Sequence, residues 1–488
     1  MRKKISVFGL SAVLLLSSML AACSGDGANP AGSGQGASNE TVTLEFWGRW
    51  DAATKNFNET IEAFQQEYPN IKVNYTLAPS SQYVQQIQSA ISGGNLPDIF
   101  ANVSQLPTYQ LEKLNVLHPL DDIFTEEERA SFYDGVWSEG STVVNGSIYS
   151  IPLYTPMRGA QLMYYNKAVM ERAGLTEADV PKSWDEMYSF SKKVREGTNG
   201  EAYGVVVGVK AQSFLPTVLA QMATAITPEV TSDALAPFNY KTGKYEFNSP
   251  GLVQSLEFIK KLQDDELLHP NSIVMNFREA TGLFEAGQAA LTFDGAWYAP
   301  QLPRELLEQV GVAPIPTKDG KPQYATFSGG SGDAYHVSKD TKHYEEVKTF
   351  IRYMAEHLYV KNAESGIAYS PIASQNENLT IANPVSQQAL KVESQLFKLV
   401  PRPFVRNPET LKIATEMSGK GSQVTLASIA EGYLVGQIQD VNDALTQLSN
   451  ATNKLFAETM EKVRASGGNV SDQDYIFPNW TPNVPYVE

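Results

Sequence analysis

The 488-residue sequence contains a single cysteine, Cys23, and few histidines. Without a second cysteine the chain cannot build a disulfide framework or a thiolate metal cluster. The histidines form no His-x-x-x-His pair and no His-Glu-x-x-His motif, and no Asp-x-Asn-x-Asn-Gly calcium loop is present. They are His118, His269, His336, His343 and His357. We therefore expect no metal site and no cofactor.

Basic residues are also scarce, with 38 Lys and Arg against 54 Asp and Glu and a formal net charge of −16. Loss of Arg2, Lys3 and Lys4 with an N-terminal signal would take the charge to −19. Such acidity argues against a nucleic-acid partner and favours solubility beside an anionic cell surface. Hydrophobic residues make up 42% of the chain and aromatic residues 10%, which indicates a well-packed protein long enough for two or more domains.

The chain has one long apolar run, from Ile5 to Leu20, and it follows the cationic residues Arg2 to Lys4. Small residues come next, in Leu20-Ala21-Ala22-Cys23, so residues 1–22 read as a signal peptide. Leu-Ala-Ala-Cys resembles the lipobox of bacterial lipoproteins, and this resemblance implies cleavage before Cys23 and acylation of its thiol. The alternative is a structural cysteine near an ordinary cleavage site. Beyond Leu20 no run approaches the roughly 18 residues needed to span a bilayer.

Residues 23–40 read SGDGANPAGSGQGASNE after the cysteine, with almost nothing apolar to bury. A Gly- and Ser-rich segment of this kind behaves as a flexible coil. The sequence therefore predicts a lipidated flexible linker over residues 23–40. It would hold the folded protein at the outer face of a membrane.

The folded part opens with a pattern of strand, helix and strand. Val42, Leu44 and Phe46 alternate with polar residues, and a second alternation runs from Ile71 to Leu77. Between them, Asp51 is placed to cap a helix that carries apolar residues at helical spacing. This is a βαβ unit with a parallel pair of strands. Further strands are expected at residues 96–100, 148–153, 161–165, 203–209 and 289–293, which gives an α/β protein.

Segments in the first three quarters of the chain resemble family 1 of the extracellular solute-binding proteins, the group that includes maltose-binding protein. In chain order they are LEFWGRW, FQQEYPNIKVNY, SGGNLPDIF, YSIPLYTP with LMYYNKAVMERAG, PKSWDEM, GKYEFNSPGLVQSLEFIKKL, LFEAGQAALTFDGAW, VAPIP and HYEEVKTFIRYM. Each motif alone is weak, and their common order between about residues 42 and 360 carries the resemblance. The last third matches less well, apart from DVNDALTQLSNATNKLF.

This resemblance implies a two-lobe, type II periplasmic-binding-protein-like fold with a hinge and a ligand cleft between the lobes. The chain would cross between lobes near Tyr149 to Tyr154, again near Val312 to Pro314, and once more after Tyr359. The expected N-lobe comprises residues 41–153 and 313–360, and the C-lobe residues 154–312 and 361–488. Residues 395–421 and 474–488 look like additions to the family's shortest members.

The resemblance also places ligand contacts at the ends of strands, where a sugar site needs aromatic platforms and fixed polar groups. In the first half of the chain these are Trp47, Arg49, Asn102 and Gln105. The alternative interpretation is purely structural: Trp47 packs in the core and Arg49 is a surface charge. Asp98 is expected to shape its own turn rather than to bind ligand.

The second group of expected ligand contacts follows the first crossing. It begins with Tyr154 and Arg158, in a segment longer than the usual family loop. Trp297 follows a buried strand in Asp-Gly-Ala-Trp, with a place in the core as its alternative. The group ends with Gly330 and Ser331, in a Gly-rich loop that lacks the Gly-Lys-Ser/Thr of a phosphate-binding loop, and with Tyr369.

The resemblance implies the substrate-binding lipoprotein of an ABC importer, which captures a sugar or oligosaccharide and delivers it to permease subunits. We expect a monomer tethered to the cell membrane and no catalytic residues. The alternative is a secreted carbohydrate-active hydrolase, because any acidic protein offers pairs of carboxylates. Arg49 and Arg158 would suit a carboxylated sugar such as a uronide if both lie in the cleft. Polyols, glycerol-phosphate compounds and iron also stay open as ligands.

Overall fold

The computed structural model describes residues 41–103, 105–210, 215–233, 236–321, 324–327, 332–417, 420 and 424–486. The predicted signal peptide (1–22), the linker (23–40) and the lipidation site Cys23 lie outside the described residues. The chain from Thr41 onward forms one compact unit.

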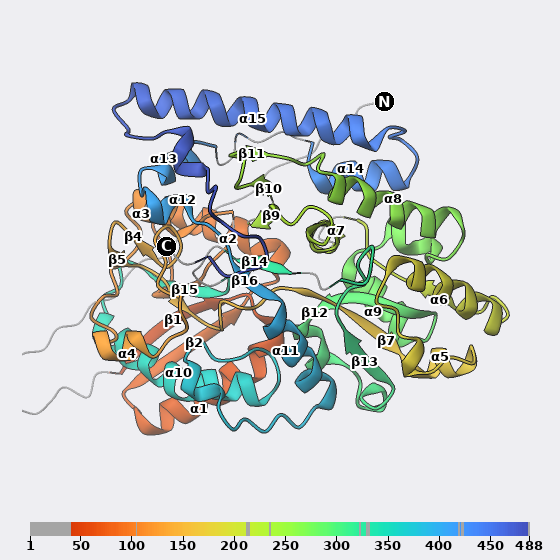
Figure 1. Ribbon diagram of the computed structural model, residues 1–488. Helices are drawn as coiled ribbons and strands as arrows, with labels where there is room; N and C mark the ends of the chain where they lie inside the picture. Colours follow the sequence, from red (N-terminus) through yellow and green to blue (C-terminus); the bar gives the residue numbers. More distant parts are fainter. Residues whose placement is uncertain are drawn as a thin grey trace, which may run out of the picture. The chain divides into compact units, whose positions relative to one another are not determined.

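The first sheet contains five strands in the order β2-β1-β3-β15-β6 (Figure 1). Strand β1 pairs in parallel with β2 and with β3, and β15 pairs antiparallel with β3 and β6. The strands are β1 (Val42–Gly48), β2 (Ile71–Leu77), β3 (Ile99–Ala101), β6 (Ile151–Pro152) and β15 (Ala334–Val337). The predicted βαβ opening is confirmed, because the alternation of Val42, Leu44 and Phe46 puts apolar side chains on one buried face.

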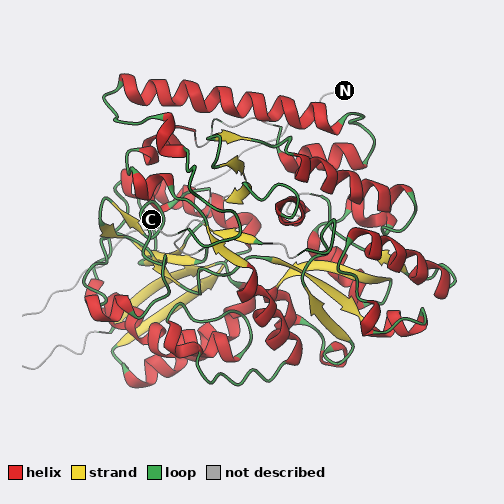
Figure 2. Ribbon diagram, in the orientation of Figure 1, coloured by secondary structure: helices red, strands yellow, loops and turns green. Residues whose placement is uncertain are grey.

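Helices cover this first sheet, and α1 packs against α10 (Figure 2). The shared core is rich in aromatic rings, with Phe46 in edge contact with Phe57, Tyr75 and Phe350. The helices in this part of the chain are α1 (Thr54–Glu67), α2 (Ser80–Gly93), α3 (Thr108–Lys113), α4 (Glu126–Ala130) and α10 (Tyr344–Glu364). A separate small hairpin joins β4 (Val143–Val144) to β5 (Ser147–Ile148).

The prediction that Asp51 caps the first helix is wrong. Asp51 begins a short 3-10 helix, η1 (Asp51–Ala53), and the N-cap of α1 is Ala53, which has no side-chain hydrogen bond. The Asp51 Oδ1 atom instead accepts from the Ala52 N–H at 2.9 Å. Its other carboxylate oxygen is thereby left to face a distant arginine, described below.

The second sheet has the order β13-β7-β12-β8. Its strands are β7 (Gln161–Asn166), β8 (Tyr203–Val205), β12 (Ala289–Gly295) and β13 (Val310–Ala313). Every residue of β7 and β12 is buried, and β7 sends Leu162 and Tyr164 into one core and Met163 and Tyr165 into another. The sheet is therefore covered on both faces. Strand β8 is shorter than the predicted 203–209.

The helices around the second sheet come from two distant parts of the chain. Those from the middle are α5 (Lys167–Arg172), α6 (Trp184–Gly197), α7 (Leu215–Thr224), α8 (Pro250–Asp264) and α9 (Phe277–Glu285). From the last quarter, α11 (Pro384–Leu396) packs against β7 and β13, and α14 (Leu426–Leu434) packs against α7 and α8. Residues of α11, α14 and the first half of α15 (Val441–Ala465) thus complete the cores of this sheet.

A fourth core is built largely by the C-terminal part of the chain. Helix α15 (Val441–Ala465) packs against α13 (Thr410–Met417) and against β11 (Lys244–Tyr245), as Figure 1 shows. Strand β11 belongs to a small antiparallel sheet with β9 (Val230–Asp233) and β10 (Ala236–Asn239). Phe477 and Trp480 of the tail are buried in this core, next to Tyr240.

Short elements connect these C-terminal parts with one another and with the rest of the chain. Strand β16 (Phe397–Leu399) pairs in parallel with β14 (Ala325–Phe327), and α12 (Pro403–Arg406) packs against the 3-10 helix η7 (Asp472–Tyr475). Helix α13 also contacts α3, beside the first sheet. A cavity of about 420 Å³ lies here, lined by α3, by the β4–β5 turn and by residues of α13 and α15.

Candidate ligand-binding site

The candidate site is organised around the carboxylate of Asp333, just before β15. Arg49 donates to its Oδ1 atom at 2.9 Å, and the Trp50 indole N–H donates to the same atom at 2.8 Å. Arg158 donates to the other oxygen, Oδ2. One partly buried carboxylate therefore joins the end of β1 to the segment that leads into the second sheet.

Asn102 closes the first-sheet side of this network. The Arg49 Nε–H donates to the Asn102 carbonyl at 2.7 Å, and the Asn102 side chain accepts from the Ala334 N–H at 3.0 Å and donates to the Gly332 carbonyl at 3.1 Å. Asn102 directly follows β3, so the carboxyl ends of β1 and β3 meet the start of β15 here. Polar groups at strand ends of this kind are where α/β sheets bind ligands.

Arg158 belongs to the crossover segment, residues 153–160, which connects β6 of the first sheet to β7 of the second. Its guanidinium carbon lies 4.4 Å from the ring centroid of Tyr154 and 5.3 Å from that of Trp297. Trp297 lies in the 3-10 helix η4 (Ala296–Gln301), immediately after β12. The two aromatic rings and the cation thus bring strand ends of both sheets together.

A second polar link lies beside the first. The Arg278 Nη2 atom of α9 pairs with Asp51 Oδ2 at 2.9 Å, and its Nη1 atom donates to the Gln301 side chain at 2.8 Å. The Gln301 amide in turn donates to the Trp297 carbonyl at 2.7 Å. This link is more exposed than the Asp333 network, since the Asp51 side chain is 66% accessible.

The structure brings together five of the predicted site residues: Arg49, Asn102, Tyr154, Arg158 and Trp297. Tyr154 is buried, and its ring lies against the Arg158 guanidinium group. Gln105 is exposed in a turn after β3. Gly330 and Ser331 lie outside the described residues. No ligand is present, so a contact role for each of these residues stays a prediction.

The remaining two predicted residues, Trp47 and Tyr369, lie at the edge of the candidate site. Trp47 packs partly buried against the core of the first sheet, and its carbonyl accepts from the Tyr83 hydroxyl at 2.9 Å. Tyr369 packs partly buried against a core of the second sheet, and its carbonyl accepts from the Thr155 N–H at 3.0 Å. Tyr369 therefore touches the crossover segment through its backbone.

Three carboxyl groups near this site differ in their titration. Burial by itself raises the pKa of Asp333, but the charges of Arg158 and Arg49 outweigh it and hold that pKa below its ordinary value. Burial raises the pKa of Asp294, at the end of β12, to about 7. Burial also raises the pKa of Glu393, on α11, to about 7, although Arg158 and the N–H groups of Gly159 and Ala160 oppose the rise.

Sequence reasoning missed Asp333, Trp50, Asp294 and Glu393. Trp50 stands inside the LEFWGRW motif, and Asp333 directly follows the Gly-rich run Ser328 to Gly332, so their positions beside predicted site residues were the signal that could have found them. Asp294 was visible as the first residue of Asp-Gly-Ala-Trp. Nothing near Glu393 in the sequence distinguishes it from other helical glutamates.

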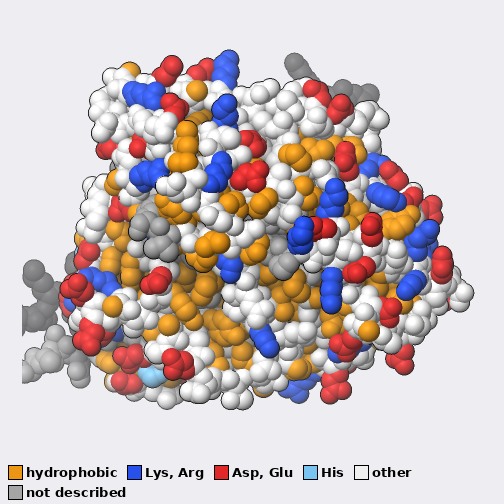
Figure 3. Space-filling view, in the orientation of Figure 1, with side chains coloured by type: hydrophobic (Ala, Val, Ile, Leu, Met, Phe, Trp, Pro, Cys, Tyr) orange, Lys and Arg blue, Asp and Glu red, His pale blue; other side chains and the backbone are white. Residues whose placement is uncertain are grey.

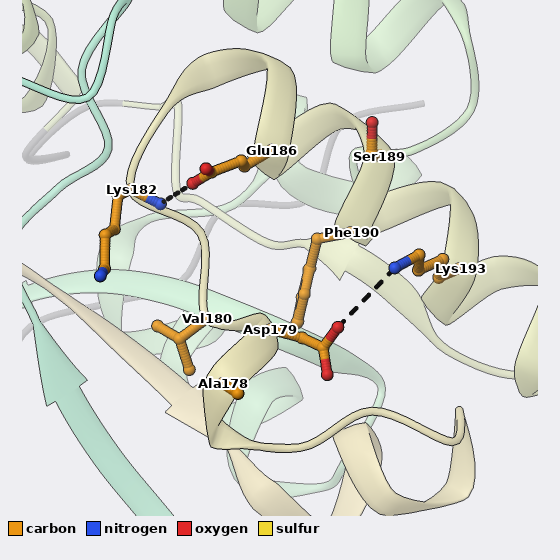
Figure 4. A pocket seen from close by; sticks show the side chains of 8 residues that line it. All are labelled: Ala178, Asp179, Val180, Lys182, Glu186, Ser189, Phe190 and Lys193. Carbon is orange, nitrogen blue, oxygen red and sulfur yellow. Dashed lines mark hydrogen bonds and ion pairs between the residues drawn. The ribbon is translucent and has the colours of Figure 1, made fainter.

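The surface offers another recess that contains none of the predicted site residues. Figure 4 shows a pocket of about 280 Å³ between η2 (Glu177–Asp179) and α6, where Asp179 faces Lys193 at 3.7 Å. Glu186 is occupied there by the capping box of α6, since its carboxylate accepts from the Lys182 N–H at 2.7 Å and from the Ser183 N–H at 3.1 Å. Glu186 therefore serves the start of α6, and Lys193 and Asp179 are paired with each other.

Neither a metal cluster nor a membrane-spanning helix is found among the described residues. They contain no group of three or more His, Cys, Asp or Glu side chains placed to hold a metal ion. Within the same residues, no helix is both long and apolar enough to cross a bilayer. On the face shown in Figure 3, acidic and basic side chains are interspersed.

Comparison with known proteins shows the family of this chain. Residues 50–357 match the family model described as bacterial extracellular solute-binding protein. The chain belongs to this family. The match covers more than half of the chain, and it confirms the family resemblance drawn from the sequence motifs.

Relatives of this solute-binding protein include an arabinooligosaccharide-binding protein of Bacillus subtilis, 27% identical over 75% of this chain and 78% of the relative. A multiple sugar-binding protein of Streptococcus mutans is 25% identical over 72% of this chain and 78% of its own length. A solute-binding protein of Thermotoga lettingae, solved with α-D-tagatose, has a TM-score of 0.66 at 20% identity and covers 85% of this chain and 100% of its own. The predicted α/β two-lobe binding-protein fold is confirmed.

Proposed function

We propose that this solute-binding protein is the substrate-binding component of an ABC importer that captures a sugar or oligosaccharide between two lobes. The observation that carries the proposal is the convergence of Arg49 and Asn102, at strand ends of the first sheet, with Arg158 of the crossover segment and with Trp297, which follows β12 of the second sheet. A ligand that touches both groups would favour a closed arrangement, because it binds that state better. The names of the relatives, which bind arabino-oligosaccharides and multiple sugars, give the ligand class.

The lobes in this proposal follow the predicted boundaries, with residues 41–153 and 313–360 in one and 154–312 and 361–488 in the other. The protein acts without catalysis, as a monomer tethered through an acylated Cys23, and passes its ligand to membrane permease subunits. The family assignment supports an extracytoplasmic location. The sequence features before residue 41 support the tether.

A neutral saccharide fits the site better than a uronide. Both arginines lie at the site, as a carboxylated sugar would require, but both already bind Asp333. A ligand carboxylate would have to compete with this partly buried carboxylate for the same guanidinium groups. The partly buried ring of Trp297 beside Arg158 adds an aromatic surface that suits the CH face of a sugar.

A thermal-shift screen tests the proposal, followed by calorimetric titration of each compound that raises the melting temperature. The panel holds arabinotriose, galactotriose, maltotriose, their monosaccharides, digalacturonate and sn-glycerol 3-phosphate. A ligand at 100 times its Kd stabilises the native state by about 2.7 kcal/mol. We expect a neutral oligosaccharide to bind at one site without shortened products. Tightest binding of digalacturonate, or turnover of any saccharide, would contradict the proposal.

Replacement of Trp297 should weaken that binding. We expect Trp297→Ala to raise the Kd of the tightest panel saccharide at least tenfold, because a stacked ring supplies about 1.4 kcal/mol or more. The matched control is Tyr188→Ala, an aromatic ring on α6 that packs beside Lys261 and Asp265. The control should keep the wild-type Kd. Equal Kd values for the two variants would show that Trp297 does not contact the ligand.

A further inference from the structure

The crossover segment is held at both ends by groups far away in the sequence. At its start, the Leu153 N–H donates to the Asp333 carbonyl at 2.8 Å, and the Thr155 N–H donates to Tyr369. At its end, the Gly159 N–H donates to the Glu393 Oε1 atom at 2.9 Å. Between these anchors stands Arg158, whose guanidinium group reaches Asp333.

Glu393 is set in a rigid surrounding. Only 2% of the residue is accessible, and its helix α11 is fixed at two further points. The Asn383 side chain caps the helix and donates to the Ala299 carbonyl of η4 at 3.0 Å, while Gln388 donates to the Val312 carbonyl of β13 at 2.7 Å. The carboxylate therefore has a defined position relative to the strands that flank the site.

The segment itself needs such an anchor. Gly159 has φ of +107°, a conformation that side-chain-bearing residues rarely adopt. Glycine reaches this conformation and many others about equally well, so local preference alone does not fix the backbone turn at this position. The Arg158 Nε–H is buried and makes no hydrogen bond among the described residues, so the guanidinium group is held by the bond from its Nη1 atom to Asp333 and by the two flanking rings. Gly159 directly follows Arg158. The Glu393 carboxylate, which accepts from the Gly159 N–H, therefore fixes the backbone from which the arginine side chain extends.

We infer that Glu393 is a positioning residue, which holds the crossover segment through the Gly159 amide so that Arg158 lies between Tyr154 and Trp297 and reaches Asp333. Only the consequence for saccharide binding rests on the proposed function. An ionised carboxylate accepts amide hydrogen bonds more strongly than a neutral one and also attracts Arg158. The hold on the segment should therefore tighten as Glu393 ionises.

The groups that face Glu393 do not share its titration range. Arg158 and Asp333 approach it from the crossover segment and from the start of β15. The pKa of Asp333 lies below its ordinary value, mainly because the two arginine charges outweigh burial. Tyr164 of β7 and Tyr369 both have a pKa raised above the usual value by burial. Burial brings the pKa of Glu393 to about 7, so its charge changes between pH 6 and 8.

Hydrogen–deuterium exchange of the full chain without saccharide tests the inference, read on a peptide that spans residues 155–163 and corrected for intrinsic exchange at each pH. We expect Glu393→Ala to speed exchange of the protected amides about tenfold at pH 8. Glu393→Gln, which keeps an acceptor oxygen, should stay within about threefold of wild type at pH 6. Wild-type protection should rise severalfold from pH 6 to pH 8, and the Gln variant should show no rise.

Asp185→Asn is the control, because the exposed Asp185 lies on α6, outside the measured peptide, and its replacement should leave the pH profile of this peptide as in wild type. The inference is overturned if Glu393→Ala exchanges like wild type, or if Glu393→Gln keeps the wild-type rise. Should the Ala variant not fold, the Gln profile alone decides. Titration with arabinotriose at both pH values separately measures the effect on saccharide binding. If wild type binds no panel saccharide, the proposed function fails while the exchange result still stands.

Discussion

Asp333→Asn is expected to lower the free energy of unfolding by about 3 kcal/mol and to abolish saccharide binding. The substitution keeps the shape of the side chain but removes the negative charge that Arg49 and Arg158 share. Breaking a buried ion pair from one side typically costs about 3–5 kcal/mol, because the partner charge is left uncompensated. Partial exposure of the side chains places this site at the lower end of that range. Urea unfolding at pH 7 measures the change.

The matched control is Asp51→Asn, which removes a carboxylate from the neighbouring ion pair with Arg278. Both side chains of that pair are substantially exposed, so the expected loss is below about 1 kcal/mol. If the two variants lose equal stability, Asp333 does not organise the site. If Asp333→Asn binds saccharide with wild-type affinity, the hydrogen-bond network around Asp333 is not part of the ligand site.

Asp294→Asn should change the pH dependence of stability more than any other single substitution of a carboxylate. Its folded-state pKa is raised to about 7 by burial, against an ordinary value of 3.8. The folded state then binds a proton that the unfolded state has released, so stability is full below about pH 4 and is lost as the pH rises to 7. The total loss is about 4 kcal/mol at pH 8. An Asn side chain carries no such proton.

Unfolding by urea at pH 5 and pH 8 measures this effect. We expect the stability of Asp294→Asn relative to wild type to rise by about 3 kcal/mol between the two pH values, and that of the exposed Asp185→Asn to stay constant. Buried His336 works in the opposite sense, because burial lowers its pKa to about 4 and its contribution is lost as the pH falls from about 6.5 to 4. Comparison with wild type cancels that contribution. A constant difference for Asp294→Asn would contradict the burial argument.

The fold could be predicted from the sequence where local patterns carry it. Alternation over residues 42–46 and 71–77 gave β1 and β2 because one face of each strand is buried in a single core. The helix between them was found, but its first turn was not, because Asp51 pairs with Arg278 instead of capping. A cap and an ion pair use the same carboxylate, and the sequence does not say which partner is present.

The site could be predicted only in part, because its centre is a contact between distant residues. Asp333 lies 284 positions from Arg49 and 175 from Arg158. Family resemblance pointed to the two arginines, Asn102, Tyr154 and Trp297 as separate contacts. That one carboxylate gathers both arginines follows from how β15 is placed beside β3, which no local pattern contains.

The span recognised by the family model, residues 50–357, does not coincide with a unit that can fold alone. Phe46 precedes it, and Ile367, Ala389 and Ile429 follow it, yet each fills one of the three large cores that the matched residues share. An expression fragment cut at the limits of the match would open all three cores to water at once. Recombinant versions of this protein should therefore extend from Thr41 through the buried Trp480, with any affinity tag joined ahead of Thr41.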